Sequence, residues 1–139
     1  MRSSEVLFLG LAVMVTWGVW SSAGKIASSR IGMQALFWYT LTTVATIIGY
    51  LAAAGQLWPL KPDTRGIIFG LLAGLTGAGG ALIFYYLLKK YPGSIIIPLT
   101  SVYPAFSVLI MVFFLKERLT HLQGVGIILA IAGVILLGI

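Results

Sequence analysis

The sequence predicts an all-α integral membrane protein, built as a bundle of five transmembrane helices. Of its 139 residues, 60% are hydrophobic and 9% are charged, whereas a soluble domain normally has about a quarter charged residues. The mean hydropathy is +1.07. The few charged residues divide the chain into five long apolar stretches. A chain with this pattern is expected to have lipid rather than water as its solvent.

Each predicted span is bounded by charged residues. Glu5 and Lys25 bracket the first span, and Arg30 and Lys61 bracket the second. A helix of about 20 apolar residues crosses the roughly 30 Å hydrocarbon core of a bilayer, so each stretch fits one crossing and none fits two. The connections are too short to separate domains. We therefore expect one domain over residues 1–139, with spans at approximately 5–28, 32–56, 66–89, 94–115 and 121–139.

Small residues recur every four positions in the third span. Gly66, Gly70, Gly74 and Ala78 would form a continuous stripe along one helix face. Such a stripe allows another helix to approach closely. It therefore predicts a tight helix pair, either within the chain or between two copies of it.

The fourth span contains two prolines, Pro98 and Pro104. Each proline removes a backbone donor and disfavours a straight helix. At membrane depth, the freed carbonyls must face protein or a water-filled cavity. The two prolines predict helix hinges, either as a simple kink at a crowded packing site or as a bend that shapes a central cavity.

The fifth span has a defined beginning. Thr120 is followed three residues later by Gln123, a spacing that matches a capping box. In this motif the two side chains accept hydrogen bonds from amide groups that have no partner inside the helix. We expect the helix to begin directly after Thr120.

The composition excludes or disfavours several classes of function. The chain has no cysteine, one histidine and three acidic residues, which leaves too few ligands for a catalytic metal site. No nucleophile–base pair is visible, so neither an enzyme nor a cofactor is expected. The nine Lys and Arg residues lie singly or in pairs at the ends of apolar stretches. A nucleic-acid-binding face is therefore not expected either.

The loop charges barely specify an orientation in the membrane. Because the number of spans is odd, the two termini are expected on opposite sides. Lys and Arg residues in short loops mark the cytoplasmic side when one side has a clear excess. Here the tally is five against four: Arg2, Lys61, Arg65, Lys116 and Arg118 on one side, and Lys25, Arg30, Lys89 and Lys90 on the other. Either the chain inserts with its N-terminus inside, or copies insert in both orientations.

The last 60 residues carry a family pattern. From residue 80 the chain reads GALIFYYLLKKYPGSIIIPLTSVYPAFSVLIMVFFLKERLTHLQGVGIILAIAGVILL. The matching residues are a proline in the fourth span, an acidic residue and a Leu-Thr pair before the fifth, and glycines within the fifth: Pro104, Glu117, Leu119, Thr120, Gly124, Gly126 and Gly133. Trp17, Gly18 and Lys25 add a match in the first span. The chain resembles an EamA domain of the drug/metabolite transporter superfamily over nearly all of its length.

The resemblance has one departure and several implications. The family often has an arginine early in its second helix, where this chain has Phe37, Trp38 and Tyr39, so no contact by that arginine is expected. Family members usually have ten helices in two inverted repeats, and this chain resembles one repeat. Because alternating access needs two halves around a central site, the resemblance implies a homodimer in a bacterial inner membrane. The balanced charges favour an antiparallel dimer, while a parallel dimer or a different five-helix partner stays open.

Polar and aromatic side chains at helical spacing are the candidate substrate-binding residues. In the first span, Trp17, Ser21 and Lys25 share one helix face. The full candidate set is Trp17, Ser21, Lys25, Tyr39, Thr43, Tyr86, Ser101 and Tyr103, with Tyr85 as an alternative to Tyr86. Such groups can equally hydrogen-bond neighbouring helices, and Trp20, Trp38 and Trp58 fit interfacial anchors. The Lys25 ammonium would either reach the lipid headgroups or face a cavity mouth and attract an anionic solute.

No acidic residue lies deep in any span, because Glu5, Asp63 and Glu117 fall at span ends or in loops. An exporter that exchanges hydrophobic cations for protons needs a buried carboxylate. We therefore expect a small secondary transporter for a neutral, zwitterionic or anionic metabolite, with membrane lipid and the small-molecule substrate as its partners besides the second copy. The alternatives are a multidrug or cation exporter of similar architecture, and an accessory membrane subunit that transports nothing.

Overall fold

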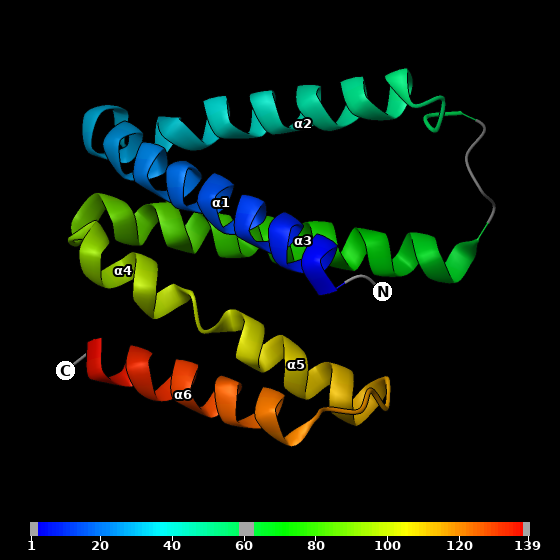
Figure 1. The fold of residues 1–139 in the computed structure, drawn as a ribbon. Coiled ribbons are helices and arrows are strands. Elements are labelled where there is room, and N and C mark those ends of the chain that lie inside the picture. The colour runs from blue at the N-terminus through cyan, green and yellow to red at the C-terminus, as the bar shows by residue number, and fades with distance from the viewer. Residues whose placement is uncertain (1–2, 59–62, 138–139) are drawn as a thin grey trace. The chain divides into compact units, whose positions relative to one another are not determined.

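The computed structural model describes residues 3–58 and 63–137, and these residues form helices and no strand. The elements are α1 (Ser3–Ile31), the 3₁₀ helix η1 (Gly32–Gln34), α2 (Ala35–Ala53), α3 (Thr64–Lys90), α4 (Gly93–Thr100), α5 (Tyr103–Phe114) and α6 (His121–Leu137). The α-helices are labelled in Figure 1. The prediction of an all-α membrane protein is confirmed. The chain divides into two compact units, an N-terminal unit (Met1–Lys90) and a C-terminal unit (Tyr91–Ile139), which we describe separately.

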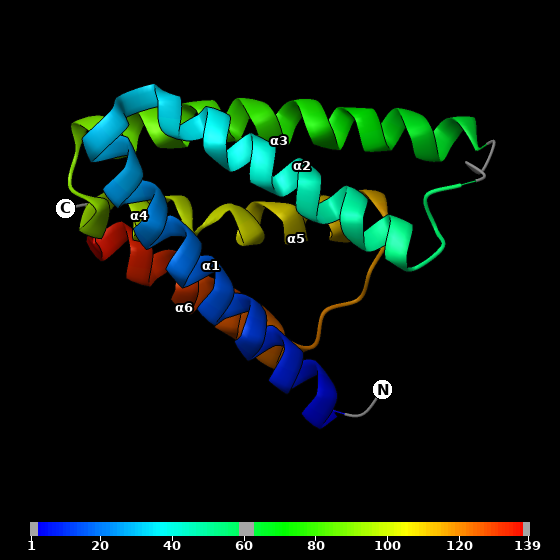
Figure 2. The same ribbon diagram turned by 90° about the horizontal axis from the view of Figure 1, so that it is seen from above.

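The helices have the length and composition of membrane spans. Among the described residues, three helical stretches are long and apolar enough to cross a membrane, namely Glu5–Ala53, Thr64–Lys90 and Gly93–Phe114. The first has 49 residues, and a straight helix of that length would measure about 74 Å, more than twice the hydrocarbon core. The chain instead reverses at η1, so α1 and α2 are separate helices (Figure 2). A shorter apolar helix covers His121–Leu136.

The three long helices of the N-terminal unit meet at η1, which contacts α1, α2 and α3. The chain reverses at Gly32, whose φ of +61° lies in the left-handed region that favours glycine. Figure 2 shows α1 and α3 close together at this end and far apart at the other. Where burial is described in this unit, the buried residues are Ser21, Gly24, Ser28, Ala35, Tyr85 and Leu88. The core of the unit therefore lies at its η1 end.

Helix α2 ends in a Schellman motif. Gly55 has a φ of +64°, and its amide donates to the Ala52 carbonyl at 3.1 Å. The Gln56 amide donates to the Leu51 carbonyl at 2.8 Å. These two bonds satisfy carbonyls that have no partner inside the helix, so α2 stops within a few residues of the predicted end of the second span.

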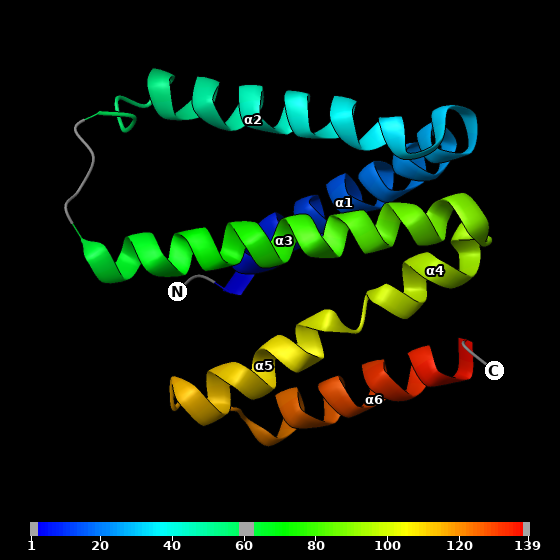
Figure 3. The same cartoon turned by 180° about the vertical axis from the view of Figure 1, so that it is seen from behind.

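The C-terminal unit contains α4, α5 and α6, and α6 contacts both other helices (Figure 3). The fourth predicted span is broken, because Ser101 and Val102 separate α4 from α5. Pro104 lies in the first turn of α5, where a missing amide removes no helical hydrogen bond. If α4 and α5 formed one continuous helix, the proline at position 104 would leave one backbone hydrogen bond of that helix unmade. The span therefore bends between Pro98 and Pro104.

The predicted capping box of the last helix is confirmed. The Thr120 amide donates to Gln123 Oε1 at 2.8 Å, and the Gln123 amide donates to Thr120 Oγ1 at 3.3 Å. Helix α6 begins at His121, as expected. At the end of α5, Lys116 adopts a φ of +57°, a left-handed conformation that is strained for a residue with a Cβ atom.

The small-residue stripe of α3 is open in the described chain. No atom outside the local helix lies within 4 Å of a Cβ placed at Gly70 or Gly74, and at Gly66 the neighbour is the nearby Asp63 side chain. Ala78 is exposed. The tight helix pair at this stripe stays a prediction.

Candidate functional site

Four aromatic side chains from three helices come together near η1 in the N-terminal unit. Trp20 of α1 stacks on Phe84 of α3, with ring centroids 5.4 Å apart, and lies 5.8 Å from Tyr39 of α2. Tyr39 stacks on Tyr85 at 5.7 Å, and Phe84 contacts Tyr85 edge-on at 6.2 Å. We call Trp20, Tyr39, Phe84 and Tyr85 the aromatic cluster. Contacts of this geometry are favourable beyond the area that they bury.

A glycine on α1 makes room for the cluster. A Cβ placed at Gly24 would lie 3.2 Å from the Tyr85 hydroxyl and 3.4 Å from its Cζ. Trp20, Gly24 and Ser28 follow one another every four residues, so they share the face of α1 that meets α3. The absence of a side chain at Gly24 therefore sets how closely the two helices approach.

Two buried serines on α1 are satisfied within their own helix. Ser21 and Ser28 are 5% and 1% exposed. The Ser21 hydroxyl donates to the Gly18 carbonyl, and the Ser28 hydroxyl donates to the Lys25 carbonyl, each at 3.0 Å. Because a hydroxyl retains lone pairs when it donates, both side chains keep the capacity to accept a hydrogen bond.

One polar atom in the cluster lacks a hydrogen bond of regular geometry. Trp20 Nε1 is buried and forms no such bond among the described residues, although the Tyr85 hydroxyl lies near enough to act as an acceptor. A buried donor without a well-formed hydrogen bond is destabilising, and a carboxylate is a stronger acceptor than a neutral hydroxyl. An acceptor group that reached Trp20 Nε1 would therefore be favoured there.

The half-buried Lys25 is engaged by the protein backbone. Its ammonium donates to the Leu88 carbonyl of α3 at 2.5 Å, across 63 residues of sequence. Leu88 is fully buried. Neither interpretation of Lys25 from the sequence included this contact, which joins α1 to the last turn of α3.

The predicted site residues fall into different environments. In the N-terminal unit, Ser21 is buried, Lys25, Tyr39 and Thr43 are half-buried, and Trp17 is 54% exposed. The Tyr86 hydroxyl, on an exposed side chain, accepts a hydrogen bond from the Lys90 ammonium. In the C-terminal unit, Ser101 donates to the Pro98 carbonyl at 2.6 Å and Tyr103 is 52% exposed. The structure joins Tyr39 directly to the aromatic cluster and places Lys25 beside it on α1.

Sequence reasoning missed three of the residues that build this region. Trp20 was interpreted as a residue that anchors the helix at the membrane interface. Phe84 and Leu88 were not among the candidate site residues. Their four-residue spacing, with Trp20 and Gly24 on α1 and Phe84 and Leu88 on α3, is the signal that could have identified them. Tyr85, rather than Tyr86, joins the aromatic cluster.

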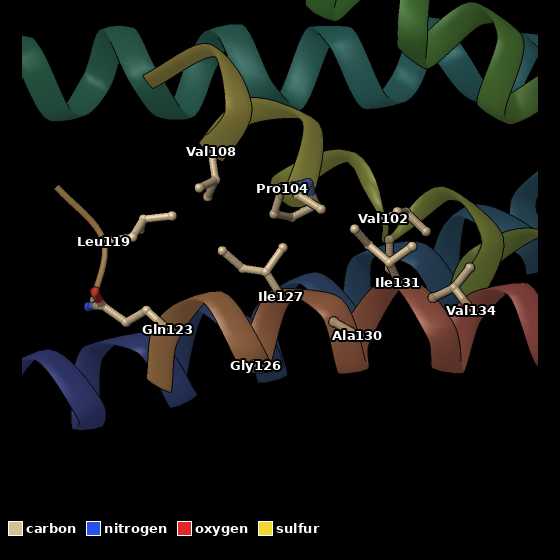
Figure 4. A pocket seen from close by; sticks show the side chains of 12 residues that line it. Val102, Pro104, Val108, Leu119, Gln123, Gly126, Ile127, Ala130, Ile131 and Val134 are labelled. Carbon is tan, nitrogen blue, oxygen red and sulfur yellow. The ribbon is translucent and has the colours of Figure 1, made fainter. Parts of the chain in front are cut away.

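The C-terminal unit contains an apolar groove between α5 and α6 (Figure 4), with a volume of about 500 Å³. We call it the α5–α6 groove. Its lining is aliphatic except for one serine and one glutamine, and consists of Ser101, Val102, Pro104, Ala105, Val108, Leu119, Gln123, Gly126, Ile127, Ala130, Ile131 and Val134. No charged residue is among them. The groove has shape but few groups that could recognise a polar solute.

Among the residues that the structure describes, no three His, Cys, Asp or Glu side chains come together as a metal site. The long apolar helices and their apolar exterior are those of a multi-pass membrane protein.

Comparison with known proteins identifies the family. The model of the EamA-like transporter family matches residues 4–139. The chain therefore belongs to this family of membrane transporters, and the resemblance seen in its sequence is confirmed.

Two relatives differ in length. The chain is 34% identical over 134 residues to the uncharacterized protein MJ1333.1 of Methanocaldococcus jannaschii, and the match covers 96% of both chains. It is 29% identical over 139 residues to a probable terminal-alkyne amino-acid exporter of Streptantibioticus cattleyicolor, covering 96% of this chain and 44% of the exporter. The chain thus spans less than half the length of that exporter. No solved structure matches the chain.

Proposed function

We propose that the protein is a small secondary transporter that moves a neutral, zwitterionic or anionic metabolite across a bacterial inner membrane by alternating access. The observation that carries this proposal is the aromatic cluster, in which the buried Trp20 Nε1 forms no hydrogen bond of regular geometry and has the Tyr85 hydroxyl as a nearby acceptor. An amino acid supplies both an acceptor carboxylate and an apolar side chain for aromatic rings. The amino-acid exporter among the relatives supports this substrate class.

The charges favour the same substrates. The three acidic residues of the sequence are Glu5, Asp63 and Glu117, and none belongs to the aromatic cluster or lies beside it in sequence. A solute that brings its own carboxylate needs no protein carboxylate as a counter-ion. A hydrophobic cation would need one to exchange with protons, so the proposal favours metabolites over cationic drugs.

The working unit that we propose is an antiparallel homodimer. Alternating access in this fold class uses two inverted halves, and two copies in opposite orientations would supply them. The open stripe of α3 at Gly70 and Gly74 offers a surface for close helix packing between copies. The five-to-four balance of loop charges is compatible with insertion in both orientations.

Solute flux into liposomes that contain only the purified protein tests the transport proposal. The solutes are a terminal-alkyne amino acid, a neutral amide, a dicarboxylate and a hydrophobic cation. Trp20→Phe keeps an aromatic ring but removes the N–H group, and is expected to raise the KM of the transported solute about tenfold, which corresponds to about 1.4 kcal/mol. Trp38→Phe, at a 57% exposed position of α2, is the matched control. Equal KM values for the two variants would exclude the aromatic cluster as the solute site.

Labelling in intact cells tests the assembly. The chain has no cysteine, so a single Thr64→Cys substitution at the start of α3 provides one thiol. A maleimide that does not cross the membrane is expected to label about half of the molecules from outside, because the antiparallel dimer needs equal numbers in each orientation. Complete labelling or none would rule out the antiparallel dimer and leave a parallel arrangement.

A further inference from the structure

The end of α3 lacks one backbone donor. In a continued α-helix, the Leu88 carbonyl would accept a hydrogen bond from the amide of residue 92. Residue 92 is proline and has no amide hydrogen. Pro92 also starts the next helix, since the Ile95 and Ile96 amides donate to its carbonyl at 3.1 and 3.2 Å. Pro92 therefore lies between α3 and α4 and caps the start of α4. Because it has no amide hydrogen, it cannot donate to the buried Leu88 carbonyl.

The Lys25 ammonium takes the place of the missing amide. It lies 2.5 Å from the Leu88 carbonyl oxygen, and Leu88 is 0% exposed, so water and lipid headgroups do not reach this residue. A cation at a helix C-terminus also interacts favourably with the helix dipole. The hydrogen bond and the positive charge of Lys25 therefore both act at the C-terminal end of α3.

The packing of α1 on α3 brings Lys25 to this place. The approach at Gly24, where a Cβ would lie 3.2 Å from the Tyr85 hydroxyl, is one residue before Lys25. At the next turn, the Lys89 side chain lies over Gly32, 3.7 Å from the position of a Cβ there. Lys25 and Leu88 follow Trp20 and Phe84 by about one turn on their respective helices, so the bond lies directly beyond the aromatic cluster.

We propose that Lys25 is a positioning residue that replaces the amide absent at Pro92, and thereby holds α1 against the last turn of α3. The bond keeps Trp20 of α1 in register with Phe84 and Tyr85 of α3. Lys25 then acts on the solute through the aromatic cluster and not by direct contact. Its consequence for transport rests on the proposed function, whereas its consequence for stability does not.

A double-mutant cycle between Lys25 and Pro92 tests the proposal on the purified full-length protein. Pro92→Ala restores an amide that allows α3 to supply its own donor to the Leu88 carbonyl. Lys25→Met is expected to lower the thermal midpoint by roughly 3–6 °C, and by less than half of that in the Pro92→Ala background. Lys90→Met, which removes the same charge from the last turn of α3, controls for the helix dipole and is expected to lower the midpoint by less than about 2 °C.

The proposal is overturned if Lys25→Met has the same effect in both backgrounds, or an effect no larger than that of Lys90→Met. If Lys25→Met alone does not fold, folded protein from the double variant with Pro92→Ala supports the proposal. The proposal is contradicted if the double variant also does not fold and Lys25→Gln lowers the midpoint as much in the Pro92→Ala background as in the wild-type background.

The same cycle separates positioning from solute binding in liposomes. For a positioning residue, Pro92→Ala restores the KM that Lys25→Met has raised. For a residue that contacts the solute, the KM stays raised whatever residue occupies position 92, and the proposal fails. If the wild-type protein transports none of the solutes, the stability cycle still decides the role of Lys25, while the proposed function alone is contradicted.

Discussion

The two units of the chain differ in what holds them together. The N-terminal unit has rings from three helices in contact, and a hydrogen bond from Lys25 to α3 that spans 63 residues of sequence. Among the described residues of the C-terminal unit, the buried side chains are Ile96 and Ala105. Hydroxyl groups there, such as those of Thr100 and Ser107, donate to carbonyls of their own helices. The Lys25–Leu88 bond is thus a polar contact between two helices of the N-terminal unit.

This difference has a physical origin and a functional consequence. Lipid tails are as apolar as leucine, so helices in a membrane gain little from burying leucine against leucine and associate through close packing and hydrogen bonds. The N-terminal unit uses both, whereas the α5–α6 groove offers aliphatic surface and space. A unit that recognises a polar solute needs groups of the first kind. Under the proposed function, we therefore expect recognition of the solute in the N-terminal unit.

The largest expected effect comes from filling the contact between α1 and α3. Gly24→Leu would place a side chain where a Cβ already lies 3.2 Å from the Tyr85 hydroxyl, and overpacking of this kind costs about 1–3 kcal/mol. The thermal midpoint is expected to fall by roughly 5 °C or more. Gly18→Leu, on the same helix with no atom within 4 Å of its Cβ position, is the control. Equal midpoints for the two variants would mean that α1 and α3 do not pack as described.

Local features of the chain could be predicted, and contacts between distant residues could not. The cap at Thr120 and Gln123 and the five apolar stretches depend on residues a few positions apart, so the sequence was sufficient. Lys25 was placed on the polar face of the first helix, but its acceptor depends on how α1 packs on α3. The predicted set contained Tyr86, whereas Tyr85 is the tyrosine of α3 that joins the aromatic cluster. The reason is the same: adjacent residues of a helix point about 100° apart, and the packing of the helix decides which of them faces inward.

A smaller effect is expected at the beginning of α6. Thr120→Ala removes the oxygen that accepts from the Gln123 amide, and loss of a cap of this type costs about 1 kcal/mol. The midpoint is expected to fall by roughly 3 °C. Thr76→Ala, whose hydroxyl bonds only to carbonyls of its own helix, serves as the comparison and is expected to change little. A larger loss at Thr76 than at Thr120 would contradict the assignment of the cap.

Relief of strain in the loop before α6 is expected to stabilise the protein. Lys116 has a φ of +57°, where glycine is favoured over other residues by about 1 kcal/mol. Lys116→Gly should therefore raise the midpoint by roughly 2–3 °C. Lys116→Ala, which removes the same charge but keeps a Cβ atom, separates strain from charge. If both variants raise the midpoint equally, the charge and not the backbone conformation is responsible.

The smallest effect is expected where the same glycine-to-leucine change is made in the C-terminal unit. Gly126 lines the α5–α6 groove, and no atom lies within 4 Å of its Cβ position. Gly126→Leu should leave the midpoint unchanged or slightly higher, because leucine has the better helix propensity and enters open space. Gly24→Leu and Gly126→Leu, measured side by side, therefore contrast a closed contact with an open one. A loss at Gly126 as large as that at Gly24 would mean that the groove is filled in the folded protein, and the C-terminal unit would then hold a packed surface of its own.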